Sequence, residues 1–355
     1  MNLKLKNIIY VTIIGILVFS TLFLVQNNFE SLNLSKILEN GGFSGNDEKL
    51  PKYIFEDSIE VYLSPNELEK VSNVSKSLNG DTIEDSIWNI VLWEEDNIEY
   101  NHEKAELPSP EVTYWVGGRT EVSDSYNNTI QSPAETLELK SGICGDYALL
   151  TSAMLLEMDY SPIYILTFES TGNPGHAAAA VNLNGNYYII DQRPPIMDLY
   201  NYLDYKKDVE NYNIDNITFY KIELVNDSVF YDKDFESVES YSAVSNKYSD
   251  IAGFSRYLMT YFENNYEIKS DYNIQYLDSM EYLPKAYEKG ITIQYFFEFG
   301  GYTPIFEKQY AKWAFDYIKN DENESRYTIS EYSSIWIRSS YDGEKLKLII
   351  NLAKK

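Results

Sequence analysis

The stretch SPAETLELKSGICGDYALLTSAMLLEM, residues 132–158, decides the fold because it predicts two helices joined by a tight turn. The second helix is expected to begin at about Cys144. It is apolar on nearly all sides, which is typical of a helix that is buried at the centre of a domain. The stretch therefore predicts a buried central helix with a cysteine at its first turn.

The first helix of this stretch carries strong local start and stop signals. Ser132 is a favoured N-cap residue, Pro133 suits the first helical position, and Glu135 completes a capping box. The helix is expected to end near Lys140, with Gly142 in left-handed geometry after it. These signals place a short turn directly before the central helix.

Cys144 is the only cysteine among the 355 residues, which excludes an intramolecular disulfide and a structural zinc site of the thiolate kind. A thiol becomes a strong nucleophile when it is deprotonated, and a helix N-terminus or a neighbouring imidazolium favours the thiolate. The backbone N–H groups at the same helix start could stabilise a developing oxyanion. We therefore expect a thiol nucleophile at Cys144.

A base for this thiol is expected from the next part of the chain. The stretch GHAAAAVNLNGNYYIIDQRPP, residues 175–195, predicts a hairpin whose Asn-Gly pair at 184–185 forms a type I′ turn. That register places Asp191 opposite Ala178, one step along the same face from His176. Side chains at such diagonal positions lie roughly 7 Å apart at the backbone. A carboxylate there can orient the imidazole and fix its tautomer.

Other candidates have plainer interpretations. His102, the second of the two histidines, has no such partners in view and is interpreted as an exposed loop residue. Asp191 could merely cap the turn, in which case Asp198 is the alternative carboxylate. The acidic residues 94–96 are interpreted as a solvated helix end rather than a metal site.

The two quoted stretches resemble the transglutaminase-like superfamily, and the resemblance extends over about residues 81–200. This family places Cys at the start of a central helix, followed by His and Asp on successive strands. The resemblance implies an α+β, papain-like core in which the central helix packs on an antiparallel sheet. It also implies that Cys144 is the nucleophile, His176 the base and Asp191 the orienting carboxylate.

The residue that completes the oxyanion hole is not fixed by a motif. Gln131 is the first candidate because it lies just before the capped helix, and Trp115 is the second. No calcium loop of the EF-hand type is present in the sequence. We expect no metal and no cofactor.

The N-terminus predicts a membrane anchor. An uncharged, mostly apolar run covers about residues 8–25, and it follows two lysines. That length suits a helix that crosses a bilayer, and the lysines place the N-terminus in the cytoplasm. A cleaved signal peptide is the alternative. The expectation is a single-pass membrane protein whose remaining domains are extracytoplasmic.

The domain organisation follows from changes in composition along the chain. We expect a cytoplasmic tip and membrane anchor over 1–26, a stalk and extension over 27–80, a catalytic domain over 81–230, and a smaller α+β domain of unknown role over 231–355. Its last hairpin is expected to turn at Asp342-Gly343. That register places five apolar side chains on one face: Ile335, Ile337, Leu346, Leu348 and Ile350.

The function expected is that of a cysteine-dependent acyl transferase, peptidase or amidase. The formal net charge of -26 repels phosphate backbones and argues against nucleic-acid binding. A peptide or protein substrate is expected, with surface or cell-wall peptides as the natural class for an anchored domain, and hydrolysis is favoured over crosslinking. The alternatives are a non-catalytic module that binds peptides or partners, and a C-terminal domain that carries the main function.

Overall fold

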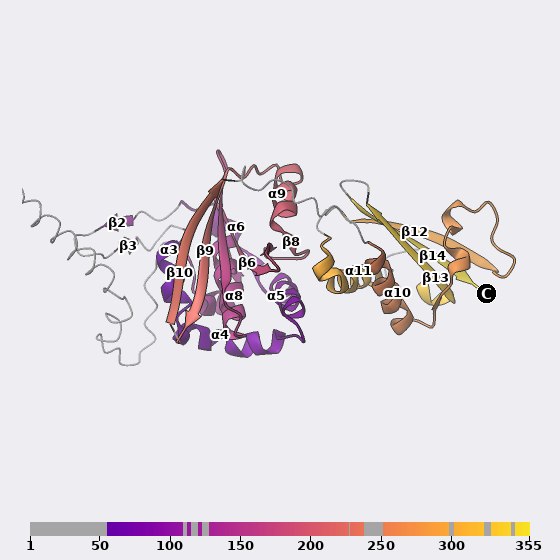
Figure 1. The fold of residues 1–355 in the computed structure, drawn as a ribbon, viewed down its shortest axis with the longest axis horizontal. Helices are drawn as coiled ribbons and strands as arrows, with labels where there is room; N and C mark the ends of the chain where they lie inside the picture. The colour runs from indigo at the N-terminus through magenta and orange to yellow at the C-terminus, as the bar shows by residue number, and fades with distance from the viewer. Residues whose placement is uncertain are drawn as a thin grey trace, which may run out of the picture. The chain divides into compact units, whose positions relative to one another are not determined.

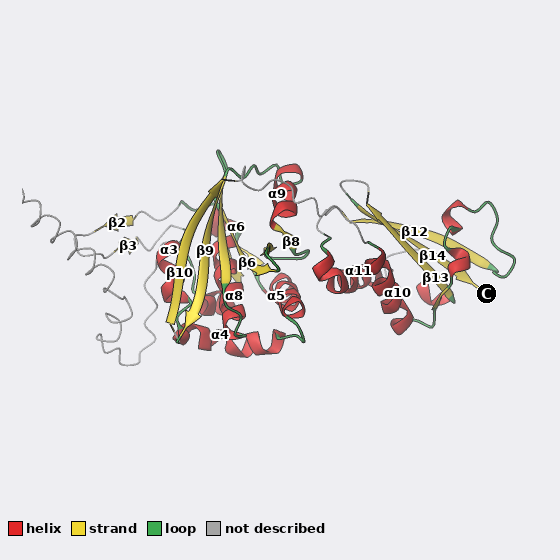
Figure 2. Ribbon diagram, viewed as in Figure 1, coloured by secondary structure: helices red, strands yellow, loops and turns green. Residues whose placement is uncertain are grey.

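The computed structural model of the protein describes residues 55–108, 112–114, 120–122, 128–226, 228–237, 251–297, 302–322, 328–341 and 345–355. Helices and strands both contribute throughout these ranges, which confirms the predicted α+β class (Figure 2). The helices are α3 (Phe55–Tyr62), α4 (Pro65–Leu78), α5 (Ile83–Asn97), α6 (His102–Ala105), α7 (Pro133–Leu139), α8 (Cys144–Glu157), α9 (Leu199–Asp208), α10 (Ala252–Asn265) and α11 (Glu307–Glu322).

The larger sheet has six strands in the order β10-β9-β5-β6-β7-β8, and every neighbouring pair is antiparallel. The strands are β5 (Ile163–Glu169), β6 (His176–Leu183), β7 (Asn186–Ile190), β8 (Met197–Asp198), β9 (Asn216–Val225) and β10 (Ser228–Ser237). Two small pairs accompany it: parallel β1 (Glu99–Tyr100) with β4 (Ser141–Gly142), and antiparallel β2 (Val112–Tyr114) with β3 (Thr120–Val122).

Helix α8 is the central helix that the sequence predicts. It packs against β5 and β6, and α4, α5 and α7 contact it in turn (Figure 1). Every residue of α8 from Gly145 to Leu156 is buried, as expected for a helix that is apolar on nearly all sides. Its first residue is Cys144, so the helix places the cysteine at the end of the layered core.

The turn before α8 differs in one detail from the prediction. The capping box of α7 forms as expected, with Ser132 and Glu135 bonding to each other's backbone N–H. Lys140, not Gly142, takes the left-handed conformation, with φ of 51°. Gly142 is instead in β4, where a Cβ atom would lie 2.9 Å from the Cβ of Asp146. Close approach rather than backbone freedom therefore requires glycine there.

The β6–β7 hairpin confirms the predicted turn and register. Asn184 and Gly185 have φ angles of 56° and 85°, as a type I′ turn requires. The strands pair Ala179 with Ile190, so Asp191 follows the last residue of β7 in the register expected. Both His176 and Asp191 are thereby fixed at the same end of the hairpin.

The C-terminal residues form a second sheet in the order β11-β13-β14-β12. Its strands are β11 (Lys269–Ser270), β12 (Lys289–Phe297), β13 (Ser334–Tyr341) and β14 (Leu346–Lys354), with short 3-10 turns η2 (Tyr272–Ile274), η3 (Leu277–Ser279), η4 (Pro304–Phe306) and η5 (Ile329–Glu331). The last hairpin pairs Tyr341 with Leu346, which is shifted by two residues from the predicted register. A two-residue shift keeps every side chain on its face, so all five predicted apolar residues are buried. The predicted turn itself lies outside the described residues.

The predicted membrane anchor has to be corrected. Among the residues that the structure describes, no helix combines the length and the apolar character needed to cross a membrane. The longest of these helices, α11, has 16 residues and carries many charges, whereas a crossing needs about 20 apolar residues. The run at 8–25 lies outside the described residues. The predicted single-pass membrane location and the extracytoplasmic placement of the other domains depended on this anchor and are withdrawn too.

Candidate active site

Cys144 lies where its sulfur can react. It is the first residue of α8, it is partly exposed, and its thiol is free. The N-cap residue Ile143 has extended backbone angles, so the chain enters the helix sharply at this point. This position matches the prediction of a thiol at the start of a buried helix.

The hairpin brings His176 and Asp191 into direct contact. Nε2 of His176 lies 2.9 Å from Oδ2 of Asp191. Their side chains are 15% and 14% exposed, so the pair is largely shielded from water but open on one side. The structure therefore assembles the two residues that the sequence predicts to act together.

The imidazole is also close enough to the thiol for the two groups to influence each other's charge. Burial lowers the pKa of His176, but the charge and hydrogen bond of Asp191 and a hydrogen bond to Cys144 raise it above its ordinary value. Nε2 is the ring nitrogen that bonds to Asp191. His176 is thus bonded to the carboxylate and influenced by the thiol.

Helix α9 supplies two further partners of Asp191 that the sequence analysis missed. The Tyr202 hydroxyl donates to Oδ2 at 2.7 Å, and Nζ of Lys206 lies 3.3 Å from the same oxygen. Burial raises the pKa of Asp191, but the charges and hydrogen bonds of His176, Lys206 and Tyr202 hold it well below its usual range. The two α9 residues are four apart and so share a face, but nothing in the sequence links that face to Asp191.

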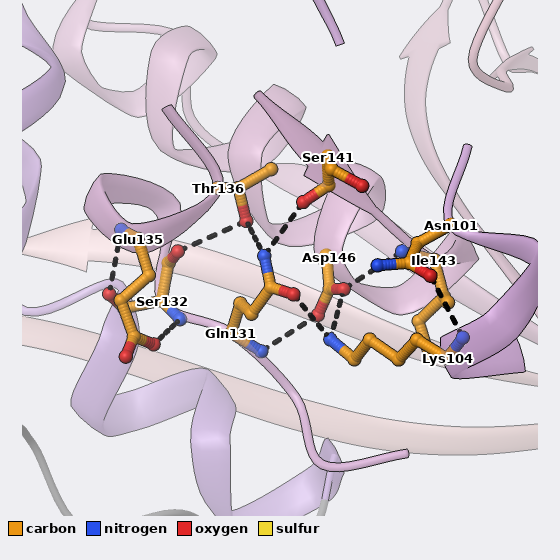
Figure 3. A network of polar contacts seen from close by, with 9 residues as sticks. All are labelled: Asn101, Lys104, Gln131, Ser132, Glu135, Thr136, Ser141, Ile143 and Asp146. Atoms are coloured by element: carbon orange, nitrogen blue, oxygen red, sulfur yellow. Dashed lines mark hydrogen bonds and ion pairs between the residues drawn. The ribbon is translucent and has the colours of Figure 1, made fainter. Parts of the chain in front are cut away.

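A buried polar network holds the entry to α8 (Figure 3). Asp146 is fully buried, and its carboxylate accepts hydrogen bonds from the backbone N–H groups of Gln131 and Ile143 at 2.7 and 2.8 Å. Lys104 donates to the same carboxylate at 2.5 Å. The network therefore connects α6, the turn before α7 and the residue that precedes Cys144. An acidic residue at N3 of a helix is the signal that could have identified Asp146.

The two predicted oxyanion residues have different outcomes. The Gln131 side chain is buried in the network, where its amide nitrogen donates to the Ser141 carbonyl at 2.9 Å and its oxygen accepts from Lys104 at 2.8 Å. A role at the oxyanion would require this amide to leave its present partners, and it stays a prediction. Trp115 lies outside the described residues.

The alternative candidates are also placed. Asp198 is the N-cap of α9 and bonds to Asn201, so it serves the helix rather than His176. His102 is exposed, as expected, but it also borders the pocket beside His176. The interpretation of residues 94–96 as a solvated helix end is wrong for Glu94, which is fully buried and accepts a hydrogen bond from Thr151 at 2.7 Å.

The environment of Glu94 is unusual for a carboxylic acid. Burial raises its pKa to about 8, against the hydrogen bond from Thr151 and with a contribution from the charge of Asp191. Its second oxygen has no hydrogen-bond partner among the described residues. A buried neutral acid therefore lies near the candidate site.

A pocket of about 390 Å³ opens beside His176 and Asp191. Its wall is formed by the loop after β7, by α9 and by the segment around Tyr100 and His102. The pocket offers space for part of a peptide next to His176 and Asp191.

Comparisons with known proteins found the following similarities. Residues 69–220 match the family described as "Transglutaminase-like domain". The chain is 32% identical to a UPF0252 protein of Archaeoglobus fulgidus, over 86% of this chain and 90% of that one. It is 30% identical to a UPF0252 protein of Pyrococcus horikoshii, over 79% and 84%. A solved structure of Legionella pneumophila LapG aligns over 49% of this chain and 92% of that one, with 17% identity and a TM-score of 0.23.

Proposed function

Since this chain belongs to the UPF0252 family and carries a transglutaminase-like domain, we propose that it is a thiol enzyme that cleaves amide bonds of peptides through a thioester. The observation that supports this proposal is the hydrogen bond of His176 to a largely shielded carboxylate, close to a partly exposed thiol. A module that only binds peptides has no chemical need for this arrangement.

The first half of the reaction follows from the geometry. The sulfur of Cys144 attacks the carbonyl carbon, and the proton of the thiol is held by His176. The carbon–sulfur bond forms, the carbon–nitrogen bond breaks, and His176 gives the proton to the departing amine. Asp191 keeps the imidazole oriented and stabilises its protonated form. The product of this half is an acyl thioester on Cys144.

The second half resolves the thioester. Water attacks the acyl carbon while His176 accepts a proton from it, and the carboxylic acid leaves as the carbon–sulfur bond breaks. A lysine amine in place of water would give an isopeptide bond. Hydrolysis is favoured because water is always present, whereas an amine needs its own binding site. Surface and cell-wall peptides followed only from the withdrawn anchor, so the substrate class here is peptide amides.

The activation of Cys144 is the step to test. We expect iodoacetamide to alkylate the wild type at about pH 6 at least tenfold faster than the His176→Asn variant. In the variant no imidazole is present to hold the thiol proton. The unfolded wild type gives the rate of an ordinary thiol. Equal rates in the folded wild type, the variant and the unfolded chain would favour the binding module instead.

A further inference from the structure

The wall of the pocket beside His176 contains one charged group, Arg193, that forms no ion pair within the wall. Among the described residues that line it, Lys206 is paired with Asp191 and with Glu210, at 3.3 and 2.9 Å, and His176 is paired with Asp191. The guanidinium of Arg193 makes no ion pair or hydrogen bond with any described residue, although exposed Glu95, outside the pocket wall, is near enough for the two charges to interact. Both carboxylates of the wall are therefore already engaged, while a cation remains available.

The backbone around Arg193 is held in one place relative to the site. The residue before it, Gln192, has a left-handed φ of 58°, and the Arg193 N–H donates to the Asp191 carbonyl at 2.5 Å. The two following residues, Pro194 and Pro195, are both buried. Arg193 itself is exposed, so its side chain extends from a fixed point two residues beyond the carboxylate that orients His176.

An unpaired arginine is notable in this chain because acidic residues outnumber basic ones by 55 to 29. The field of this guanidinium reaches the pocket wall: burial raises the pKa of Tyr205, and the charge of Arg193 is among those that oppose the rise. A guanidinium is planar and offers paired N–H donors, which match the two oxygens of a carboxylate. An amine is a poorer match for this wall, since both of its carboxylates are already paired.

We propose that Arg193 makes this pocket a subsite for a carboxylate of the substrate peptide, next to the amide that Cys144 attacks. The inference rests on the proposed function and adds the class of substrate: a peptide with an acidic group beside the scissile bond. That group is either an acidic side chain or the C-terminal carboxylate. Arg193 then determines specificity and is not a part of the proton transfer.

The test compares an anionic with a neutral alkylating reagent of nearly the same size. In the wild type we expect the ratio of the Cys144 alkylation rate by iodoacetate to that by iodoacetamide to be high. The ratio should fall at least about fivefold in Arg193→Gln, and further in Arg193→Glu, because attraction is replaced by repulsion. Lys207→Gln, which removes an exposed cation outside the pocket wall, should leave the ratio within about twofold.

The source of the carboxylate is distinguished by protection from iodoacetamide. N-acetylglutamic acid α-amide carries it on the side chain, N-acetylglutamine carries it at the C-terminus, and N-acetylglutaminamide lacks it. The compound that protects the wild type best, and loses that effect in Arg193→Gln, identifies the source. If neither acid protects better than the neutral amide, the peptide assignment is overturned.

The two proposals fail in different ways. A folded wild type that alkylates no faster than the unfolded chain contradicts the proposed function. Cys144 could instead be reactive but show the same iodoacetate preference in the wild type, Arg193→Gln and Arg193→Glu. That result overturns the carboxylate subsite and leaves the proposed function standing.

Discussion

Nε2 of His176 lies 2.9 Å from Oδ2 of Asp191, although 15 positions separate the two residues along the chain. The contact exists because a two-residue turn brings the ends of β6 and β7 together. One short local signal, the Asn-Gly pair, therefore fixes the geometry of the candidate base and its carboxylate.

The pKa of His176 should depend on this contact. We expect Asp191→Asn to lower it by roughly 1–3 units, because the burial that lowers the pKa stays while the charge that raises it is lost. The measurement is a proton NMR titration of the two histidines, with His102→Gln to assign the signals. An unchanged titration of His176 would show that Asp191 does not control its protonation.

Tyr202 is expected to support Asp191 rather than to react. Tyr202→Phe keeps the ring, which packs 5.2 Å from Phe168 between centroids, and removes the hydroxyl that donates to Asp191. We expect the unfolding free energy to fall by about 1 kcal/mol, measured by urea unfolding. The iodoacetamide rate of Cys144 should fall by less than about tenfold. A loss of reactivity as complete as that of His176→Asn would assign Tyr202 a direct role.

Lys104 is expected to hold the entry to α8 through Asp146. Lys104→Met leaves a fully buried carboxylate without its cation, and we expect the unfolding free energy to fall by about 3 kcal/mol. The double variant Lys104→Met/Asp146→Asn removes both charges and should recover part of that loss. Urea unfolding of the two single variants and the double variant gives the coupling energy. Strict additivity would mean that the pair has no energetic connection.

Glu94 should make stability fall with rising pH. Its pKa in the folded protein, about 8, is above the value of an unfolded glutamate, so the stabilisation is complete at low pH and is lost as the pH rises towards 8. Between the pKa of an unfolded glutamate, 4.5, and about 8, the unfolding free energy should fall by about 1.4 kcal/mol per pH unit. Glu94→Gln keeps the acceptor for Thr151 and should remove this slope, measured by urea unfolding at several pH values. A slope that survives the substitution would assign the effect to another group.

Local signals explain which parts of the site could be predicted. The start of α8 at Cys144 and the register of the β6–β7 hairpin follow from capping and turn residues within a few positions. Lys104 and Tyr202 could not be found in this way, because their partners are 42 and 11 residues away and only the fold brings them together. The burial of Glu94 could not be predicted from its charge, because the packing of α5 on α8 decides which side chains are buried.

The N-terminal anchor is a prediction that rested on a local signal and was wrong. Apolar length predicted a membrane helix at 8–25, and none of the described helices, from α3 onward, could take that role. The prediction of surface substrates depended on that helix and not on the site. The proposed chemistry depends only on groups within the transglutaminase-like domain and is unaffected.

The most direct measurement is intact-protein mass spectrometry of an acyl adduct on Cys144. The wild type is quenched in acid during reaction with a peptide that carries an acidic residue beside a carboxamide, and the adduct is then treated with hydroxylamine. We expect a hydroxylamine-sensitive thioester in the wild type, a slower one in His176→Asn and none in Cys144→Ser. A folded wild type that cleaves the peptide without such an adduct, or with the same yield in Cys144→Ser, would contradict the thioester mechanism.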